Sequence, residues 1–346
     1  MLIFLLLFLS TLSSTLLGFF IGAIENNSAD VLVYDDTARR NLQASRIDPS
    51  LVDAVAAVPG VAAAAPIGEL TLTATLDSEL TDLSLWGVDL AGPGSPEPII
   101  EGRLPGPGEV VVDQSATSEG FEIGETIRLV PSGTELAIVG YVQDRRYAVV
   151  ATAYLDFNHW VDIFESEFPG SPLVPLSMIG VETVSGEDPT AVADRITSTV
   201  AGLEGLDRAT AAAGTPGVES ISQSFTLIVG ITFGIVVLVV GFFFLILTVQ
   251  RLRSFVTLRA IGASTAYLAR SLIIQIVVLV LLGAAIGALI TMGATLGSSA
   301  AFPLSLDGGL VVTVTSAVLV FSVLAGLLSI RRISRTDAAQ AAQGMH

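Results

Sequence analysis

Long apolar runs alternate with polar stretches along the chain and determine its organisation. The runs that contain no Asp, Glu or Arg are residues 2–24, 224–249, 271–297 and 309–330. A helix of about 20 apolar residues crosses the hydrocarbon core of a bilayer, so each run predicts a membrane span. We count the first span from Met1, as residues 1–24. The polar segment 25–221 is too long for a loop, so we expect a multi-pass α-helical membrane protein with four spans, arranged as one span, a large domain and three more spans.

Two passages of this large domain repeat one order of elements: a short apolar strand, a helix opened by an Asp-Pro pair, and a second strand. An aspartate N-cap followed by proline is typical of a helix start. The strands are expected at 30–34 and 61–66 around a helix from Asp48 to about residue 58, and at 177–184 and 206–213 around a helix from Asp188 to about residue 201. We therefore expect an α/β fold, a duplicated β-α-β layer made of residues 25–67 and 163–221.

Residues 68–162, between these two passages, carry a different pattern. Short runs of strand-forming residues are separated by Gly and Pro, and they read TLTATL, LSLWGV, EVVVD, TIRLV and ELAIVGYV. This pattern predicts a β-rich insertion into the α/β layer.

The net charge of −17 is distributed very unevenly. Residues 25–221 carry 31 acidic residues and nine Arg, whereas the connection 250–270 has four Arg and no acidic residue. The tail, residues 331–346, has three Arg and one Asp. Because short basic loops stay in the cytoplasm, we expect the connection and the tail on the cytoplasmic side of the cell membrane and the acidic domain on the outer side.

The first span has an alternative interpretation as a cleaved signal peptide, with a processing site near Ala29. The length of the apolar run and the lack of a basic region before it favour a span. Because Met1 opens directly into the apolar run, a native start upstream of Met1 stays an open alternative.

Composition excludes much catalytic chemistry. All 16 basic residues are Arg, Cys is absent, and His occurs twice. A P-loop or Schiff base needs Lys, and thiolate chemistry needs Cys, so we expect a membrane subunit without its own catalytic site, cofactor or metal. His159, beside Trp160, is a candidate ligand for a haem or metal or a candidate part of an amphiphile site, although packing is the commoner role of such a residue. The pair Arg145-Arg146 is a candidate contact for anionic headgroups or for a partner protein. The alternative, a solvated turn, is the commoner role of such a pair.

The cytoplasmic connection contains the most specific motif, TVQRLRSFVTLRAIGASTAYLARSLIIQ. It resembles the corresponding loop of FtsX/MacB-like (type VII) permeases of ABC transporters, with Ser254-Phe255 where the family commonly has Glu. The tail RRISRTDAAQAA and the outer segment EGRLPGPGEVVVD are also similar to that family, and the layout is closest to its DevC/HrtB-like branch. The residues expected to contact the ATPase by this resemblance are Arg251, Arg253, Leu258, Arg259, Ala260, Ile261, Gly262 and Ala263.

The resemblance implies a permease homodimer driven by a separate ABC ATPase subunit, which would bind ATP and Mg. It implies export or extraction of a lipid or another amphiphile, and no nucleic-acid partner. An alternative function is a signal transmitter that uses the same machinery to activate an extracellular partner, such as a cell-wall hydrolase, without transport. A membrane-anchored enzyme is disfavoured because no catalytic constellation is present in the sequence.

Overall fold

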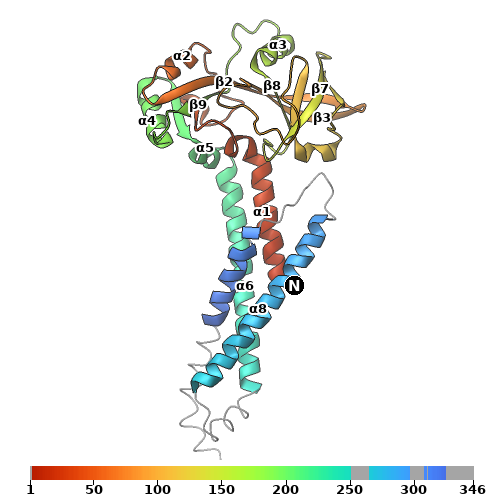
Figure 1. Cartoon of the computed structure of the whole chain (residues 1–346), viewed down its shortest axis with the longest axis vertical. Helices are drawn as coiled ribbons and strands as arrows, with labels where there is room; N and C mark the ends of the chain where they lie inside the picture. Colours follow the sequence, from red (N-terminus) through yellow and green to blue (C-terminus); the bar gives the residue numbers. More distant parts are fainter. Residues whose placement is uncertain (1, 251–264, 297–307, 310, 325–346) are drawn as a thin grey trace, which may run out of the picture. The chain divides into compact units, whose positions relative to one another are not determined.

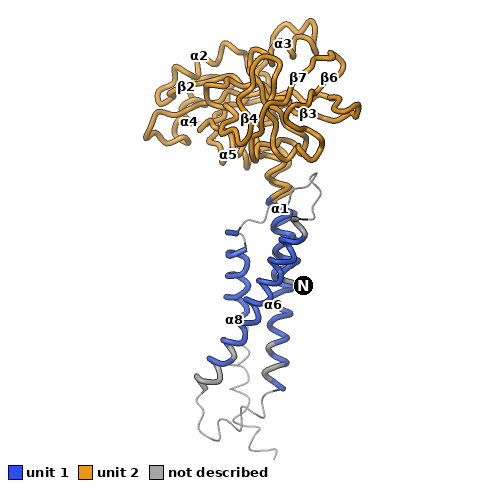
Figure 2. The backbone as a smooth tube through the Cα atoms, turned by 45° about the vertical axis from the view of Figure 1, so that its right-hand side comes forward, with its two compact units in different colours: residues 1–14, 223–298, 304–346 blue, residues 15–222, 299–303 orange. Residues whose placement is uncertain are grey.

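The computed structural model describes residues 2–250, 265–296, 308–309 and 311–324. The chain divides into two compact units (Figure 2). The membrane unit comprises Met1–Ser14, Gln223–Ser298 and Leu304–His346, and the outer unit comprises Thr15–Ser222 and Ser299–Pro303.

Long apolar helices confirm a multi-pass membrane protein (Figure 1). They are α1 (Leu2–Glu25), α6 (Val218–Gln250) and α8 (Thr265–Leu296). Each contains a stretch of at least 21 residues that is apolar enough to cross a bilayer. A shorter apolar helix, Val311–Leu324, lies on the fourth predicted span, of which residues 325–330 are outside the described part of the chain.

Small residues allow two helices of the membrane unit to approach closely. A Cβ atom added to Gly287 of α8 would lie 3.1 Å from the backbone nitrogen of Phe4 in α1, and one added to Gly283 would lie 3.1 Å from the Ile3 side chain. By contrast, a Cβ at Gly230 or Gly234 of α6 would meet nothing within 4 Å. Gly283 and Gly287 of α8 therefore permit a close helix contact within the membrane unit.

One mixed sheet runs through the outer unit (Figure 1). Its strand order is β10-β1-β9-β2-β3-β8-β5-β7-β4, with β6 pairing with β2 and β7. The strands are β1 (Val31–Asp35), β2 (Val61–Leu76), β3 (Glu79–Val88), β4 (Glu101–Gly102), β5 (Glu109–Asp113), β6 (Thr126–Val130), β7 (Glu135–Val142), β8 (Ala151–Asp156), β9 (Met178–Thr183) and β10 (Leu203–Asp207). The helical elements are η1 (Asp36–Ala38), α2 (Leu51–Ala56), η2 (Gln114–Glu119), α3 (Phe157–Glu167), α4 (Pro189–Thr199) and α5 (Arg208–Gly214).

The strands of the two β-α-β passages alternate at one end of this sheet. β1 pairs antiparallel with both β10 and β9, and β9 pairs antiparallel with β2. This is the split β-α-β arrangement, in which each passage inserts its strands between those of the other. The two passages therefore form one layer.

The alternation of side chains along β1 assigns a different cover to each face of this layer. Val31 and Val33 lie in a buried cluster with residues of α2 and α4, such as Val55 and Val192. Residues 32 and 34, which point the other way, lie in a cluster that includes the end of α1 and part of α5. The outer end of the first span is thus part of the core of the outer unit.

The strand-rich middle of the chain continues the same sheet. β2 extends from the α/β layer across residue 68 and pairs with β3 as a long antiparallel hairpin. Trp160 of α3 packs against the glycines at positions 68 and 87, where any Cβ would collide with its ring. Each of the five short runs predicted in this region is a strand: β2, β3, β5, β6 and β7.

Two expectations near the helix starts are corrected. The predicted strand 206–213 is wrong beyond Asp207, because the alanine-rich stretch RATAAAG forms α5, with the Asp207 carboxylate accepting from Thr210 N at 3.0 Å. Asp48 does not open its helix directly: its carboxylate accepts from Ser50 N at 2.9 Å in a turn, and α2 begins at Leu51.

Candidate functional site

The residues predicted to contact an ATPase lie outside the described part of the chain, and their role stays a prediction. They are Arg251, Arg253, Leu258, Arg259, Ala260, Ile261, Gly262 and Ala263. The described residues offer another candidate site, the junction between the outer end of α1 and the loop 143–150, which connects β7 to β8.

Main-chain hydrogen bonds join this loop to α1. Ala23 N in the helix donates to Arg146 O at 2.9 Å, while Ala148 N and Val149 N of the loop donate to Phe20 O and Phe19 O, each at 3.0 Å. Since these bonds involve backbone atoms on both sides, they hold the position of the chain and not only of its side chains. We call this contact the α1 clamp.

Gly22 makes the α1 clamp sterically feasible. A Cβ atom at this position would lie 2.7 Å from Asp144 O, and Asn26 Nδ2 donates to the same oxygen at 2.7 Å. In the loop itself, Asp144, Ala148 and Val149 all have positive φ, between 51° and 66°. Such conformations are unfavourable for non-glycine residues and persist only where surrounding contacts hold them.

Both arginines of the Arg145-Arg146 pair are buried, each 4% exposed, so the interpretation as a solvated turn is wrong. The Arg146 guanidinium forms an ion pair with Glu119, donates to Val149 O at 3.0 Å and lies 4.9 Å from the centre of the Phe19 ring. Arg146 therefore connects η2, the loop and α1 at one point.

The carboxylate of Asp113, at the end of β5, holds the loop from the other side. It accepts from Arg145 N at 2.6 Å and from Ser115 N at 3.0 Å. A buried carboxylate stabilised by backbone N–H groups is a rigid anchor. The loop is thus fixed to the sheet as well as to α1.

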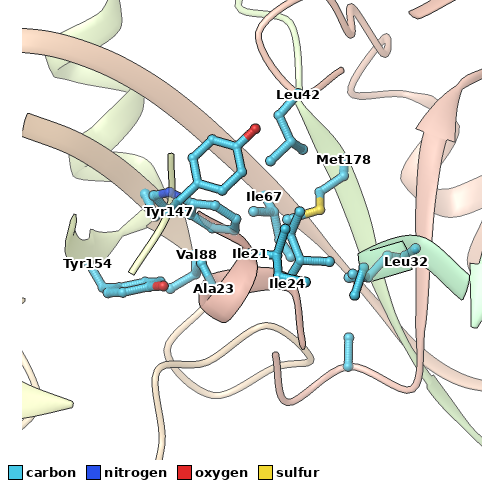
Figure 3. Packing of buried hydrophobic residues seen from close by; sticks show 14 of the residues in the cluster. Ile21, Ala23, Ile24, Leu32, Leu42, Ile67, Val88, Tyr147, Tyr154 and Met178 are labelled. Carbon is cyan, nitrogen blue, oxygen red and sulfur yellow. The ribbon is translucent and has the colours of Figure 1, made fainter. Parts of the chain in front are cut away.

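A buried apolar cluster lies beneath the α1 clamp (Figure 3). Ile21 and Ile24 of α1 pack there with Tyr147 and Tyr154, and Val218, the first residue of α6, belongs to the same cluster. The point where the chain leaves its first span and the point where it enters its second therefore share one core.

An open pocket of about 480 Å³ lies beside the α1 clamp and is lined mainly by charged and polar groups. Its charged residues are Glu25, Glu97, Asp144, Arg145 and Arg208. None of them forms a salt bridge with another described residue. Partial burial, together with the nearby Asp113 carboxylate, raises the pKa of Asp144. Burial lowers the pKa of Arg145, and the positive charge of Arg208 acts in the same direction.

A buried carboxyl group lies elsewhere in the outer unit. Glu69 of β2 accepts hydrogen bonds at Oε1 from Thr71 Oγ1 at 2.8 Å and from Ser84 Oγ at 2.9 Å, while Oε2 has no partner among the described residues. Burial raises the pKa of Glu69. This carboxyl group is therefore suited to holding a proton inside the sheet.

His159 lies on α3, away from the α1 clamp, and its Nε2 is buried without a hydrogen-bond partner among the described residues. Within the described ranges, no group of three or more His, Cys, Asp or Glu side chains is arranged to hold a metal ion. The structure thus gives His159 no described companion ligands.

These features define an integral membrane subunit whose first span is bonded to a large outer domain. Over residues 2–199 the chain matches the MacB-like periplasmic core domain, and over residues 226–338 the C-terminal domain of FtsX-like permeases. The chain belongs to the FtsX/MacB-like (type VII) family of ABC transporter permeases. It is a cell-membrane protein with a large extracytoplasmic domain.

Relatives with similar sequences occur in mycobacteria. The uncharacterized ABC transporter permease Rv0072 of Mycobacterium tuberculosis is 26% identical over 294 residues, covering 84% of this chain and 77% of that protein. The uncharacterized ABC transporter permease Mb2592 of Mycobacterium bovis is 26% identical over 295 residues, with the same coverage.

Two solved structures are similar to the outer unit. The periplasmic region of MacB from Actinobacillus actinomycetemcomitans is 13% identical with a TM-score of 0.40, and covers 54% of this chain and 92% of its own. The extracellular domain of the transporter YknZ from Gram-positive bacteria is 16% identical with a TM-score of 0.36, and the match covers 52% of this chain and 100% of that domain.

The sequence did not single out the α1 clamp. In the sequence, Gly22 forms a small-xxx-small pair with Gly18, of the kind that packs helix against helix. The structure places a loop, and not a helix, against Gly22. The available signals were a glycine in the last turns of the first span and an arginine pair soon after the predicted strand ELAIVGYV.

Proposed function

We propose that this permease exports or extracts an amphiphile from the outer leaflet of the membrane. It acts as a homodimer, and a separate cytoplasmic ABC ATPase that binds ATP and Mg supplies the energy. The family supports the ATPase partner, and the mycobacterial relatives are likewise named ABC transporter permeases. The connection 250–270 is the proposed contact with that ATPase.

The α1 clamp is the observation that carries the mechanism. Because α1 is bonded to the outer unit through backbone atoms at Phe19, Phe20 and Ala23, a displacement of the helix along its axis moves the loop and the sheet with it. A conformational change that displaces the outer part of α1 is therefore transmitted to the loop and the sheet of the outer unit.

The composition of the spans supports an amphiphile as the substrate. The four apolar runs contain no charged residue, whereas ion-coupled carriers and aqueous ion pathways depend on charged groups within the membrane. An amphiphile keeps its apolar part in the bilayer and needs only its polar group displaced toward the outer unit.

Signal transmission to an extracellular partner is the second candidate, and the same α1 clamp favours it. A displacement of the outer part of α1 moves the loop and the sheet whether or not a substrate is carried. The two functions differ in what regulates the cycle: an amphiphile in the bilayer, or a protein at the outer surface.

The two candidates are separated by reconstituting the permease with its ATPase in liposomes and measuring ATP hydrolysis. We expect lipophilic compounds to stimulate hydrolysis and to leave the outer leaflet in an ATP-dependent manner. Stimulation by an extracellular protein, with no effect of any amphiphile, would support the signal transmitter and contradict export.

A further inference from the structure

The pocket beside the α1 clamp contains an unusual combination of charges. Arg145 is 4% exposed, and its guanidinium donates to two main-chain carbonyls, Ser95 O at 3.1 Å and Glu97 O at 2.5 Å. No carboxylate of the described residues pairs with it as a salt bridge. The Asp113 carboxylate favours the charged guanidinium but forms no salt bridge with it, so a bound anion in the pocket would stabilise this buried cation further.

Arg208, the first residue of α5, directs a second guanidinium to the same pocket. Its Nη1 donates to Asn27 O at 2.6 Å, which fixes the side chain across the turn that follows α1. The positive charge of Arg208 is close enough to disfavour the charged form of Arg145. An anion bound between these two guanidinium groups would reduce the electrostatic repulsion between them. The planar arrangement of guanidinium N–H donors matches the oxygens of a phosphate group.

The remaining charges of the pocket are acidic. Glu25, Glu97 and Asp144 line it, and none of them has an ion-pair partner in the described part of the chain. These carboxylates disfavour a free phosphate dianion. They favour a ligand that carries a protonated amine together with its phosphate, because each charge of such a ligand then finds an opposite charge.

The position of the pocket agrees with a lipid. Glu25 is the last residue of α1, and residues 26–28, which follow directly, also line the pocket. The end of a membrane span lies at the depth of the lipid headgroups.

We propose that this pocket binds the headgroup of an amphiphile in which a phosphate ester carries a protonated amine. Arg145 and Arg208 contact the phosphate, and the acidic residues Glu25, Glu97 and Asp144 receive the amine. The inference rests on the proposed function in taking the ligand from the membrane, but binding itself requires neither ATP nor the ATPase.

The test compares the full chain with two single variants purified under the same conditions. Arg208→Gln removes one proposed phosphate contact at an exposed position. Arg46→Gln is the matched control, because Arg46 is also exposed and also donates to main-chain carbonyls, those of Gln43 and Ser45, but lies outside the pocket. Native mass spectrometry measures the lipid retained from nanodiscs that contain equal amounts of phosphatidylethanolamine and phosphatidylglycerol.

We expect the wild-type chain and Arg46→Gln to retain phosphatidylethanolamine preferentially, and Arg208→Gln to retain about tenfold less, the effect of losing a charge-assisted hydrogen bond. Asp144→Asn should reduce the preference for phosphatidylethanolamine over phosphatidylglycerol. Equal retention by Arg208→Gln and Arg46→Gln would overturn the phosphate site, and an unchanged preference in Asp144→Asn would overturn the amine site.

Competition by soluble compounds identifies the source of the ligand. We expect phosphoethanolamine to displace the lipid and inorganic phosphate to be much weaker; equal displacement by the two would overturn the headgroup assignment. Retention that persists in a reconstituted complex unable to move any amphiphile would contradict the proposed function while leaving this pocket supported.

Discussion

Glu69 is the buried ionisable group whose chemistry the fold determines most clearly. One carboxylate oxygen is fully used by the hydroxyls of Thr71 and Ser84, and the other has no partner in the described residues. Burial favours the neutral form, so the pKa of this carboxyl lies above that of an ordinary glutamate. The native state therefore binds a proton more tightly at this position than the unfolded chain does.

The sign of the resulting pH dependence follows from this difference. Below the pKa of about 4.3 of an unfolded Glu, both states are protonated and Glu69 contributes no pH-dependent term. As the pH rises above this value, ionisation stabilises the unfolded chain and the free energy of unfolding falls, until Glu69 also ionises in the native state. Glu69→Gln, which cannot ionise, should lack this loss of stability.

We expect the wild type to be less stable than Glu69→Gln by about 1–3 kcal/mol near pH 7.5, and the difference to shrink near pH 4. Urea unfolding of the full chain, followed by the fluorescence of Trp86 and Trp160, both in the outer unit, measures it. Parallel pH profiles for the two proteins would show that the buried carboxyl does not hold its proton.

Gly22 permits the α1 clamp, and a matched glycine one turn earlier provides the control. In Gly22→Ala the new Cβ would lie 2.7 Å from Asp144 O, whereas in Gly18→Ala it meets nothing within 4 Å. Both changes gain about 1 kcal/mol of helix propensity, but only the first must displace the loop, at a cost of ~1–3 kcal/mol. We expect amide hydrogen exchange at Ala148 and Val149 to become about tenfold faster in Gly22→Ala alone. Equal amide exchange rates at Ala148 and Val149 in both variants would show that the loop accommodates the new Cβ without loss of stability.

At the scale of elements, local pattern predicted most of the strands, whereas β4 and β8 had no counterpart among the expected runs. The runs EVVVD and TIRLV became β5 and β6 at the predicted positions, because β-branched residues between turn residues favour strands. Asp188 also caps α4 as expected, accepting from Thr190 N at 3.2 Å. Where helix propensity and an aspartate cap competed with an expected strand, as after Asp207, the helix formed.

The candidate site could not be predicted in the same way, because its contacts join residues far apart in the sequence. By residue type, a solvated turn is the commoner role of Arg145 and Arg146. Instead, Asp113 accepts from the main-chain N of Arg145 and Glu119 pairs with the Arg146 guanidinium, and both acids lie about 30 positions earlier. The positive φ angles of Ala148 and Val149 have no signal in residue identity. Tertiary contacts alone bring this loop to α1.

The exposed face of α6 leads to a prediction about assembly. Leu227 and Ile231 are 65% and 62% exposed, and Gly230 beside them has no described atom within 4 Å of an added Cβ. If a second copy packs here, Gly230→Leu should weaken the dimer by ~1–2 kcal/mol, roughly tenfold in dissociation constant. Gly293→Leu in α8, an equally open glycine, is the control. Sedimentation in detergent measures the dimer, and equal dimer content in both variants would place the interface elsewhere.

At the scale of the whole molecule, two helices belong to both units. Residues up to Ser14 of α1 lie in the membrane unit, and the rest of this helix lies in the outer unit. In α6 the order is reversed: residues up to Ser222 lie in the outer unit, and the rest lies in the membrane unit. The helices themselves are therefore the connection between the two units. Their cytoplasmic ends are where energy from an ATPase must enter.

The connection 250–270 is the proposed entry point, and its positive charge alone would be explained by membrane topology. Arg259→Glu and Arg270→Glu separate the two explanations, since both reverse one charge in the same connection but only Arg259 lies in the motif LRAIG. Reversal of a desolvated interfacial charge costs a few kcal/mol, and reversal at a rim much less. We expect Arg259→Glu to lose co-purification of the ATPase subunit and stimulated ATP hydrolysis, while Arg270→Glu retains both and the two variants insert equally. If the two variants behave alike, the arginines of this connection serve orientation in the membrane, and the contact with the ATPase lies outside the motif.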